Sequence, residues 1–180
     1  MKIVLITFEQ FTDVDVYLPW NLLNRVKRPD WTVRILADSP RVTSRTGLGL
    51  EVHGPLSEAR EADAVIITSG DLTRTLSKDA AFLAKLELAP SRQLIGSMCS
   101  GALILGAKGL LRGLTATTYP TAWKELEAFG ATAVQDVYWT LAVEVHRAGQ
   151  GGRLGATALA CEVGLELRPN AALTGGAAAA

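Results

Sequence analysis

The chain has 180 residues, a length that fits one ordinary domain and leaves little room for two. Hydrophobic residues make up 48% of it and charged residues 20%, so it is neither disordered nor low-complexity over most of its length. Its 18 basic residues balance its 18 acidic ones, which gives no compositional support for binding nucleic acid or anionic lipid. We therefore expect one globular domain.

Four apolar runs rich in β-branched residues predict strands along the chain. They cover residues 2–8, 31–37, 63–68 and 93–97. Such nearly continuous apolar runs are typical of strands that are covered on both faces, as they are in a parallel sheet. The pattern therefore favours a parallel sheet over an antiparallel sheet with one wet face.

Helical patterns follow these runs, at residues 18–25, 79–88, 101–107 and 121–129. Alternation of strand and helix predicts an α/β fold, with a doubly wound, mostly parallel sheet sandwiched by helices. In such folds the loops at the carboxyl ends of the strands form the functional site. We therefore look for chemistry directly after each predicted strand.

Targeting and metal signals are weak in this sequence. The N-terminal apolar run is too short for a signal peptide and no 18-residue apolar stretch follows, so we expect a cytoplasmic protein with no membrane partner. Cys99 and Cys161 cannot form a disulfide framework or a CxxC site, and His53 and His146 lie far apart in sequence. We expect no metal, ordinary loop histidines, and a buried structural thiol at Cys161 in a helix over residues 156–167.

Cys99 is the most informative residue, because it stands where an apolar strand runs into a helix. Ser97 precedes it by two residues and Gly101 follows it by two, and small residues there allow the sharp turn that exposes a nucleophile. A helix start should favour the thiolate and place N–H groups near a developing anion. The alternative is a small residue that packs under the helix.

Several segments together resemble the ThiJ/PfpI family of the class I glutamine amidotransferase-like superfamily, over roughly residues 1–135. The likeness is greatest to the branch that contains isonitrile hydratase, in which Thr or Ser and then Gly follow the cysteine. The fold implied is flavodoxin-like. The matching segments are Phe8 and residues 12–16, 67–71, 97–101 and 106–118.

The resemblance implies roles for individual residues. Cys99 and Asp15 match the catalytic pair of that branch, with Asp15 four residues before Pro19. Gly70 and Ser100 are the implied backbone donors to an oxyanion. The family likeness also implies a small-molecule substrate, a homodimer and no cofactor.

Structural alternatives compete with these roles. Asp13 fits an N-cap better than a site role, and Asp15 could also be a cap. Ser100 is either a neutral helix-start residue or a site hydroxyl. Tyr119 is a candidate pocket residue, and Trp20 could line a pocket too, although aromatic residues at such places are more often part of the core.

The sequence also departs from the family pattern near the site. Ser100 stands where relatives described as peptidases carry His, so we expect no peptidase activity. Tyr119 stands where many relatives have another His. The usual Pro-Gly-Gly loop here contains Ser69, which puts the conformation of that loop in question.

The last quarter of the chain differs more strongly. After about residue 136 the expected strands, Asp-Gly turn and Thr-Ala-Gly-Gly helix start are not recognisable. Either this part has diverged or the reading frame changes there. We expect one domain over residues 1–168 and a flexible tail over residues 169–180.

Three functions fit these residues. The first is a hydratase or hydrolase in which Cys99 attacks a small electrophilic molecule and Asp15 transfers protons. The second is a glyoxalase or deglycase that uses the same pair. The third is a redox or stress-response protein in which Cys99 is oxidised to sulfinate.

Overall fold

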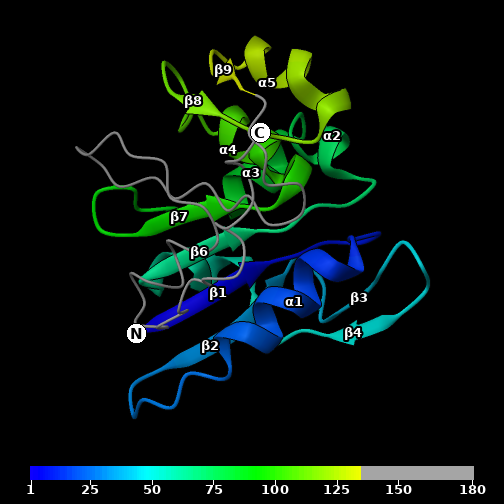
Figure 1. Ribbon diagram of the computed structural model, residues 1–180. Helices are drawn as coiled ribbons and strands as arrows, with labels where there is room; N and C mark the ends of the chain where they lie inside the picture. Colours follow the sequence, from blue (N-terminus) through cyan, green and yellow to red (C-terminus); the bar gives the residue numbers. More distant parts are fainter. Residues whose placement is uncertain (135–180) are drawn as a thin grey trace, which may run out of the picture.

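The computed structural model describes residues 1–134, and these form a parallel sheet with helices on both faces (Figure 1). The sheet order is β5-β2-β1-β6-β7, and every pairing in it is parallel. The predicted α/β fold with a mostly parallel sheet is confirmed. The strands are β1 (Lys2–Ile6), β2 (Thr32–Ala37), β5 (Gly54–Pro55), β6 (Ala64–Ile67) and β7 (Leu94–Ser97).

The central strand shows why these runs are apolar throughout. Ile3 and Leu5 belong to the hydrophobic cluster on one face of the sheet, whereas Val4 and Ile6 belong to the cluster on the other. Successive side chains of a strand point to opposite faces, so a strand covered on both sides needs apolar residues at every position. The two clusters form the core on either side of the sheet.

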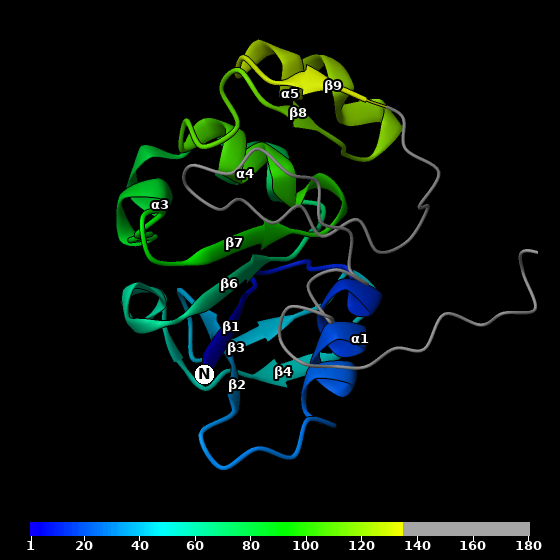
Figure 2. The ribbon, with the colours of Figure 1, turned by 60° about the vertical axis from the view of Figure 1, so that its left-hand side comes forward.

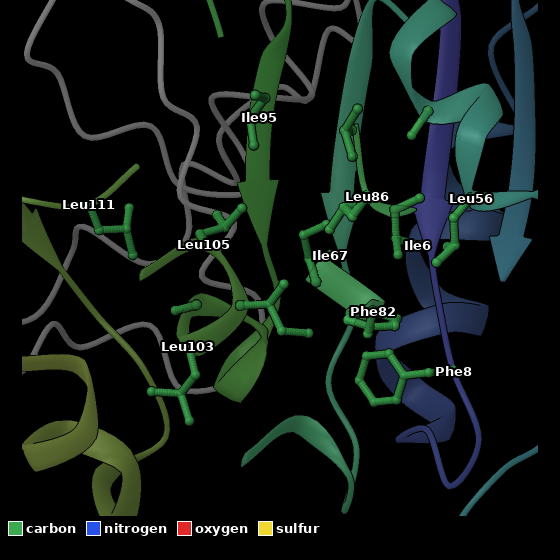
Figure 3. Close-up of a cluster of buried hydrophobic side chains, with 14 of the residues drawn as sticks. Ile6, Phe8, Leu56, Ile67, Phe82, Leu86, Ile95, Leu103, Leu105 and Leu111 are labelled. Atoms are coloured by element: carbon green, nitrogen blue, oxygen red, sulfur yellow. The ribbon is translucent and has the colours of Figure 1, made fainter. Parts of the chain in front are cut away.

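Different helices cover the two faces. Helix α1 (Asp13–Leu23) packs through Val16 and Leu23 on one face, and α3 (Ala80–Lys85) and α4 (Ala102–Ala107) pack on the other. Figure 2 shows α1 on the side of the sheet away from α3. On the α3 and α4 face, side chains from β1, β6 and β7 meet Leu103 and Leu105 (Figure 3).

The strand register brings three loops to one edge of the sheet. Ile6 of β1 lies opposite Ile67 of β6, and Ile67 lies opposite Ser97 of β7. All three strands therefore end at the same level, and the loops that follow them leave the sheet side by side. This arrangement places the segments after residues 6, 67 and 97 together.

Several short elements lie outside the central sheet and its main helices. An antiparallel hairpin follows β2, and a small two-stranded sheet with a helix follows α4. The additional elements are β3 (Arg41–Thr43), β4 (Gly49–Glu51), η1 (Leu56–Glu61), α2 (Thr73–Leu76), β8 (Thr115–Ala116), η3 (Pro120–Ala122), α5 (Trp123–Ala128) and β9 (Thr132–Ala133).

The helix limits differ from the predicted ones. The helix expected over residues 18–25 begins at Asp13, so Pro19 lies inside it rather than near its start. The helix expected over residues 79–88 ends at Lys85, and Asp79 is its N-cap. Within residues 1–134, no helix is long and apolar enough to cross a bilayer. The helix expected over residues 156–167 and the expected tail lie outside the described residues.

Candidate active site

Cys99 lies at the sharp turn between β7 and α4. Its backbone has a φ of 49°, in the left-handed region that residues with a side chain rarely adopt. A Cβ on Gly101 would lie 2.6 Å from the carbonyl oxygens of Ile67 and Thr68, so the helix start passes against the end of β6 with no room for a side chain. The predicted strand-to-helix turn is present, and this close approach requires glycine at position 101.

Asp15 lies in the first turn of α1 and is only 3% exposed. The hydroxyl of Ser69 donates a hydrogen bond to Oδ2 of this carboxylate, and the backbone N–H of Ser69 also bonds to it. Burial raises the pKa of Asp15 above its ordinary value, although the two bonds from Ser69 oppose the shift. The carboxyl group is therefore easier to protonate than an exposed aspartate.

The surroundings of Cys99 disfavour its thiolate. Burial raises the pKa of the thiol, and the negative charge of Asp15 raises it further. The Ser69 hydroxyl and the N–H and hydroxyl of Ser100 bond to the sulfur and lower its pKa, but these effects are smaller. The N–H of Ser100 at the helix start does favour the thiolate, as expected, but burial and the charge of Asp15 outweigh it, so the pKa of Cys99 is raised overall.

Gly70 and Ser100 meet at the side chain of Thr73. The N–H of Gly70 donates to Oγ1 of Thr73 over 3.0 Å, and the Ser100 hydroxyl lies 3.2 Å from the same oxygen. A Cβ on Gly70 would lie 2.4 Å from the carbonyl oxygen of Gln10, so only glycine fits at this crossing of two loops. Both predicted backbone donors are therefore engaged, Gly70 with Thr73 and Ser100 with the sulfur of Cys99.

Tyr119 lies at the periphery of this group. It is 54% exposed and comes directly after Thr118, whose hydroxyl donates to the carbonyl oxygen of Cys99 over 3.1 Å. The chain therefore brings Tyr119 next to the cysteine turn, and its exposure rules out the alternative that it is a core residue. Trp20 instead stacks on His53, with ring centroids 5.0 Å apart.

Sequence reasoning missed Ser69 and Thr12. The Ser69 oxygen lies 3.1 Å from Oγ1 of Thr12, and Ser69 is 1% exposed. Ser69 was recognised only as a departure from the Pro-Gly-Gly pattern. The signal that could have identified it is a hydroxyl in the loop after β6, at the edge of the sheet where β7 delivers Cys99.

Asp13 has a different role from the one predicted. Thr12 occupies the N-cap position of α1, and Asp13 is the first helical residue. Bonds from Ser44 and Thr46 lower the pKa of Asp13, and the Thr46 hydroxyl lies 2.9 Å from Oδ1. Asp13 therefore ties the β3–β4 hairpin to the start of α1.

The other predicted residues lie apart from this group. His53 is an exposed loop residue, as predicted, and its Nδ1 accepts the N–H of Ile35 over 2.9 Å. His146 and Cys161 lie outside the described residues. Among residues 1–134, no three potential metal-binding side chains gather at one place.

Comparison with known proteins gives consistent results. A sequence model of the DJ-1/PfpI family matches residues 1–150. Isonitrile hydratase from Pseudomonas putida is 30% identical over 138 residues, which are 76% of this chain but only 60% of that enzyme. A deglycase from Pyrococcus horikoshii is 26% identical over 125 residues, 67% of this chain and 73% of the deglycase.

Solved structures show the same fold. A ThiJ/PfpI family protein from Pseudomonas syringae superimposes with a TM-score of 0.68 at 29% identity, covering 75% of this chain and 57% of that protein. A ThiJ/PfpI domain protein from Brachyspira murdochii also gives 0.68, covering 91% and 94%, but its 15% identity supports the fold alone. This chain thus spans about three fifths of two of these relatives.

Proposed function

Because this chain belongs to the DJ-1/PfpI family, we propose that it adds water to a small electrophilic molecule through Cys99, with isonitriles as the first substrate class to test. The observation that carries the proposal is the buried Asp15 carboxylate, which the Ser69 hydroxyl holds and whose negative charge acts on the thiol of Cys99. Covalent hydration requires a nucleophile and a nearby group that accepts and donates protons, and we assign these roles to Cys99 and Asp15.

The first stage of the proposed reaction forms a covalent intermediate. The sulfur of Cys99 bonds to the terminal carbon of the isonitrile, and the proton that leaves the thiol reaches the same carbon by way of Asp15. The product of this stage is a thioimidate that joins the enzyme to the substrate. Asp15 suits this role because burial raises its pKa above the ordinary value, so the carboxylate accepts a proton more readily than an exposed aspartate does.

The second stage releases the product. Water adds its oxygen to the same carbon while its proton passes through Asp15 to the nitrogen. The carbon–sulfur bond then breaks, the sulfur regains a proton from the new hydroxyl, and an N-substituted formamide leaves. The N–H of Ser100 lowers the pKa of the Cys99 thiol and is our proposed donor to negative charge on the sulfur. The N–H of Gly70 is bonded to Thr73, so Gly70 has no donor role in this reaction.

A glyoxal or glycated substrate is the second candidate. The likeness to the Pyrococcus horikoshii deglycase favours it, and an aldehyde carbon can be attacked by the same sulfur. A redox sensor has less support, because peroxide oxidises the thiolate and the raised pKa of Cys99 keeps the thiolate fraction low at neutral pH.

The test is turnover by the purified 180-residue chain. We expect consumption of an aliphatic isonitrile or of methylglyoxal by the wild type and by Cys161→Ala, and no consumption by Cys99→Ala. Cys161→Ala is the matched control because it removes the other thiol. Equal rates for Cys99→Ala and the wild type would refute the proposal. Casein should not be cleaved, because Ser100 stands where peptidase-like relatives carry histidine.

We also propose a cytoplasmic homodimer, as the family resemblance implies. The chain mass is 19.1 kDa, so light scattering coupled to size-exclusion chromatography should give twice that value. A mass of one chain at micromolar concentration would contradict the dimer. This test is separate from the turnover test, since either result is compatible with a working Cys99 and Asp15 pair.

A further inference from the structure

Arg74 joins helix α2, which follows the loop after β6, to the segment that follows β8. Its Nε donates a hydrogen bond to Oε1 of Glu125 over 2.7 Å. Its Nη2 donates to both the carbonyl oxygen and the hydroxyl oxygen of Thr121, each over 3.0 Å. One guanidinium group therefore connects α2 with both η3 and α5 (Figure 1).

The segment that Arg74 holds also reaches the backbone of Cys99. The hydroxyl of Thr118 donates to the carbonyl oxygen of Cys99 over 3.1 Å. The indole N–H of Trp123 in turn donates to the carbonyl oxygen of Thr118 over 3.3 Å. A chain of bonds thus runs from α2 through residues 118–125 to the cysteine turn.

The backbone of Cys99 needs such a restraint. Its φ of 49° is a conformation that a residue with a side chain keeps only when the surrounding structure holds it there. The bond from Thr118 fixes the carbonyl group of this strained residue. Loosening residues 118–122 would remove that bond and let the turn relax.

From these contacts we propose that Arg74 is a positioning residue for Cys99, which it holds in place by fixing residues 118–122 against the cysteine turn. Arg74 acts through Thr118 and not on the reacting atoms. The proposal rests on the nucleophilic role that the proposed function gives to Cys99. It does not depend on which substrate the sulfur attacks.

The number and geometry of its bonds suit Arg74 to this task. The side chains of Arg74 and Glu125 are 47% and 35% exposed, and an exposed ion pair alone contributes little to stability. The planar guanidinium group, however, also bonds to the main chain and the side chain of Thr121. Because its donors are arranged in a rigid fork, it reaches both partners at once, which a lysine ammonium at the same place would not do.

The first experiment compares Arg74→Met with its parent chain, in which Cys161→Ala leaves one thiol. Methionine keeps an apolar stem and removes the guanidinium group. We expect amide hydrogen exchange over residues 118–122 to become about fivefold faster, in line with the loss of a few exposed hydrogen bonds. Alkylation of Cys99 by iodoacetamide should also become faster, by about threefold, because the partly buried sulfur becomes more accessible.

Arg60 provides a matched control. Its exposed side chain forms an ion pair with Glu87 over 3.1 Å, and it lies in η1, which precedes β6 at the edge of the sheet opposite Cys99. Arg60→Met should leave both rates unchanged. Arg74→Lys, which keeps the charge without the fork, should give rates between those of the parent and Arg74→Met.

A double-mutant cycle tests the route of the effect. Thr118→Val keeps a similar shape and removes the hydroxyl that bonds to the carbonyl oxygen of Cys99. If Arg74 acts through this hydroxyl, Arg74→Met should not change the alkylation rate further in the Thr118→Val background. Additive effects of the two substitutions would show that Arg74 affects Cys99 by another route, and would contradict the proposal.

Two other results would overturn the proposal. An alkylation rate in Arg74→Met equal to that of the parent would show that the bonds of Arg74 do not position Cys99. Equal changes in Arg74→Met and Arg60→Met would show only a general effect of losing an exposed charge. Circular dichroism and urea unfolding check that each variant is folded, and Arg74→Lys decides the question if Arg74→Met does not fold.

The turnover assay remains a separate test. Alkylation by iodoacetamide and hydrogen exchange need no substrate, so they report on Arg74 even if no isonitrile or glyoxal is consumed. If the parent chain does turn over a substrate, Arg74→Met should lower the rate while it raises the rate of alkylation. A parent chain that consumes neither substrate would count against the proposed function and leave the result for Arg74 unchanged.

Discussion

The sulfur of Cys99 is surrounded by groups with opposing effects on its ionisation. Burial and the charge of Asp15 raise the pKa of the thiol, while bonds from Ser69 and Ser100 lower it. Burial has the largest effect, and the charge that adds to it belongs to Asp15, which lies 84 positions away in sequence. A pattern confined to residues 93–105 therefore predicts the nucleophile but not its acidity.

Asp15→Asn should lower the pKa of Cys99. The substitution keeps the size of the side chain and removes the negative charge that opposes thiolate formation. The thiolate absorbs ultraviolet light more strongly than the thiol, so its titration can be followed in this variant and in the wild type, with Cys99→Ala as the blank. An unchanged or higher titration midpoint in Asp15→Asn would show that the carboxylate does not act on the sulfur.

The strands were predicted closely and the helices less so. The predicted strand over residues 63–68 is observed at Ala64–Ile67, because strands buried on both faces leave an unmistakable apolar run. The start of α1 was placed five residues too late, since Pro19 is more typical of a first helical turn than of a helix interior. The β3–β4 hairpin has short, largely exposed strands and leaves no such signal.

The candidate site was predictable in part. Cys99 and Asp15 follow from a local turn pattern and a family resemblance, and in the structure Asp15 is bonded to Ser69 and its charge acts on the thiol of Cys99. The Ser69 contact with Asp15 joins residues 54 positions apart. No local pattern encodes such a contact, because it depends on the level at which β1, β6 and β7 end.

Gly101→Ala tests the turn between β7 and α4. The new methyl group would meet two backbone carbonyl oxygens at 2.6 Å, and backbone cannot move aside as a flexible side chain can. We expect a loss of about 1–3 kcal/mol in the free energy of unfolding, measured with urea, together with a changed alkylation rate of Cys99.

Gly109→Ala is the matched control. Gly109 has a φ of 76° and open space around it, so an added methyl group strains the backbone without a collision. The variant should lose about 1–2 kcal/mol and leave Cys99 alkylation unchanged. If Gly101→Ala also left the alkylation rate unchanged, the turn would not depend on the close approach to β6.

At the scale of the whole molecule, one edge of the sheet brings together the loops of the candidate site. The loops after β1, β6 and β7 leave the sheet at the same level, and backbone bonds such as that from Thr12 N–H to the Ser69 carbonyl hold them together. The β3–β4 hairpin adds a bond from the Arg45 N–H to the Phe11 carbonyl. The site is therefore supported by main chain from several parts of the fold.

Asp15 should make the fold less stable as the pH rises. The pKa of Asp15 is raised in the folded state, so its favourable contribution is complete below its ordinary value of 3.8 and is lost as the pH rises through the folded pKa. Asp15→Asn removes this dependence. The melting temperature of the variant, relative to wild type, should therefore increase from about pH 4 toward neutrality.

Calorimetry of both proteins across this pH range checks the prediction. The lost bonds to Ser69 should affect the variant equally at all pH values, so only the pH-dependent part of the difference is informative. A difference that stays constant, or that falls as the pH rises, would mean that the carboxyl group of Asp15 is not disfavoured by its surroundings.

The left-handed backbone at position 99 favours glycine over a residue with a side chain. Glycine adopts a φ of 49° without strain. In urea unfolding, the free energy of unfolding of Cys99→Gly should therefore exceed that of Cys99→Ala by roughly 0.5–1 kcal/mol, after the greater flexibility of unfolded glycine is counted. Equal stabilities would mean that the turn is relaxed. A measured difference would show that a side chain at position 99 lowers the stability of the fold. The protein would then carry the sulfur of Cys99 at a cost in stability.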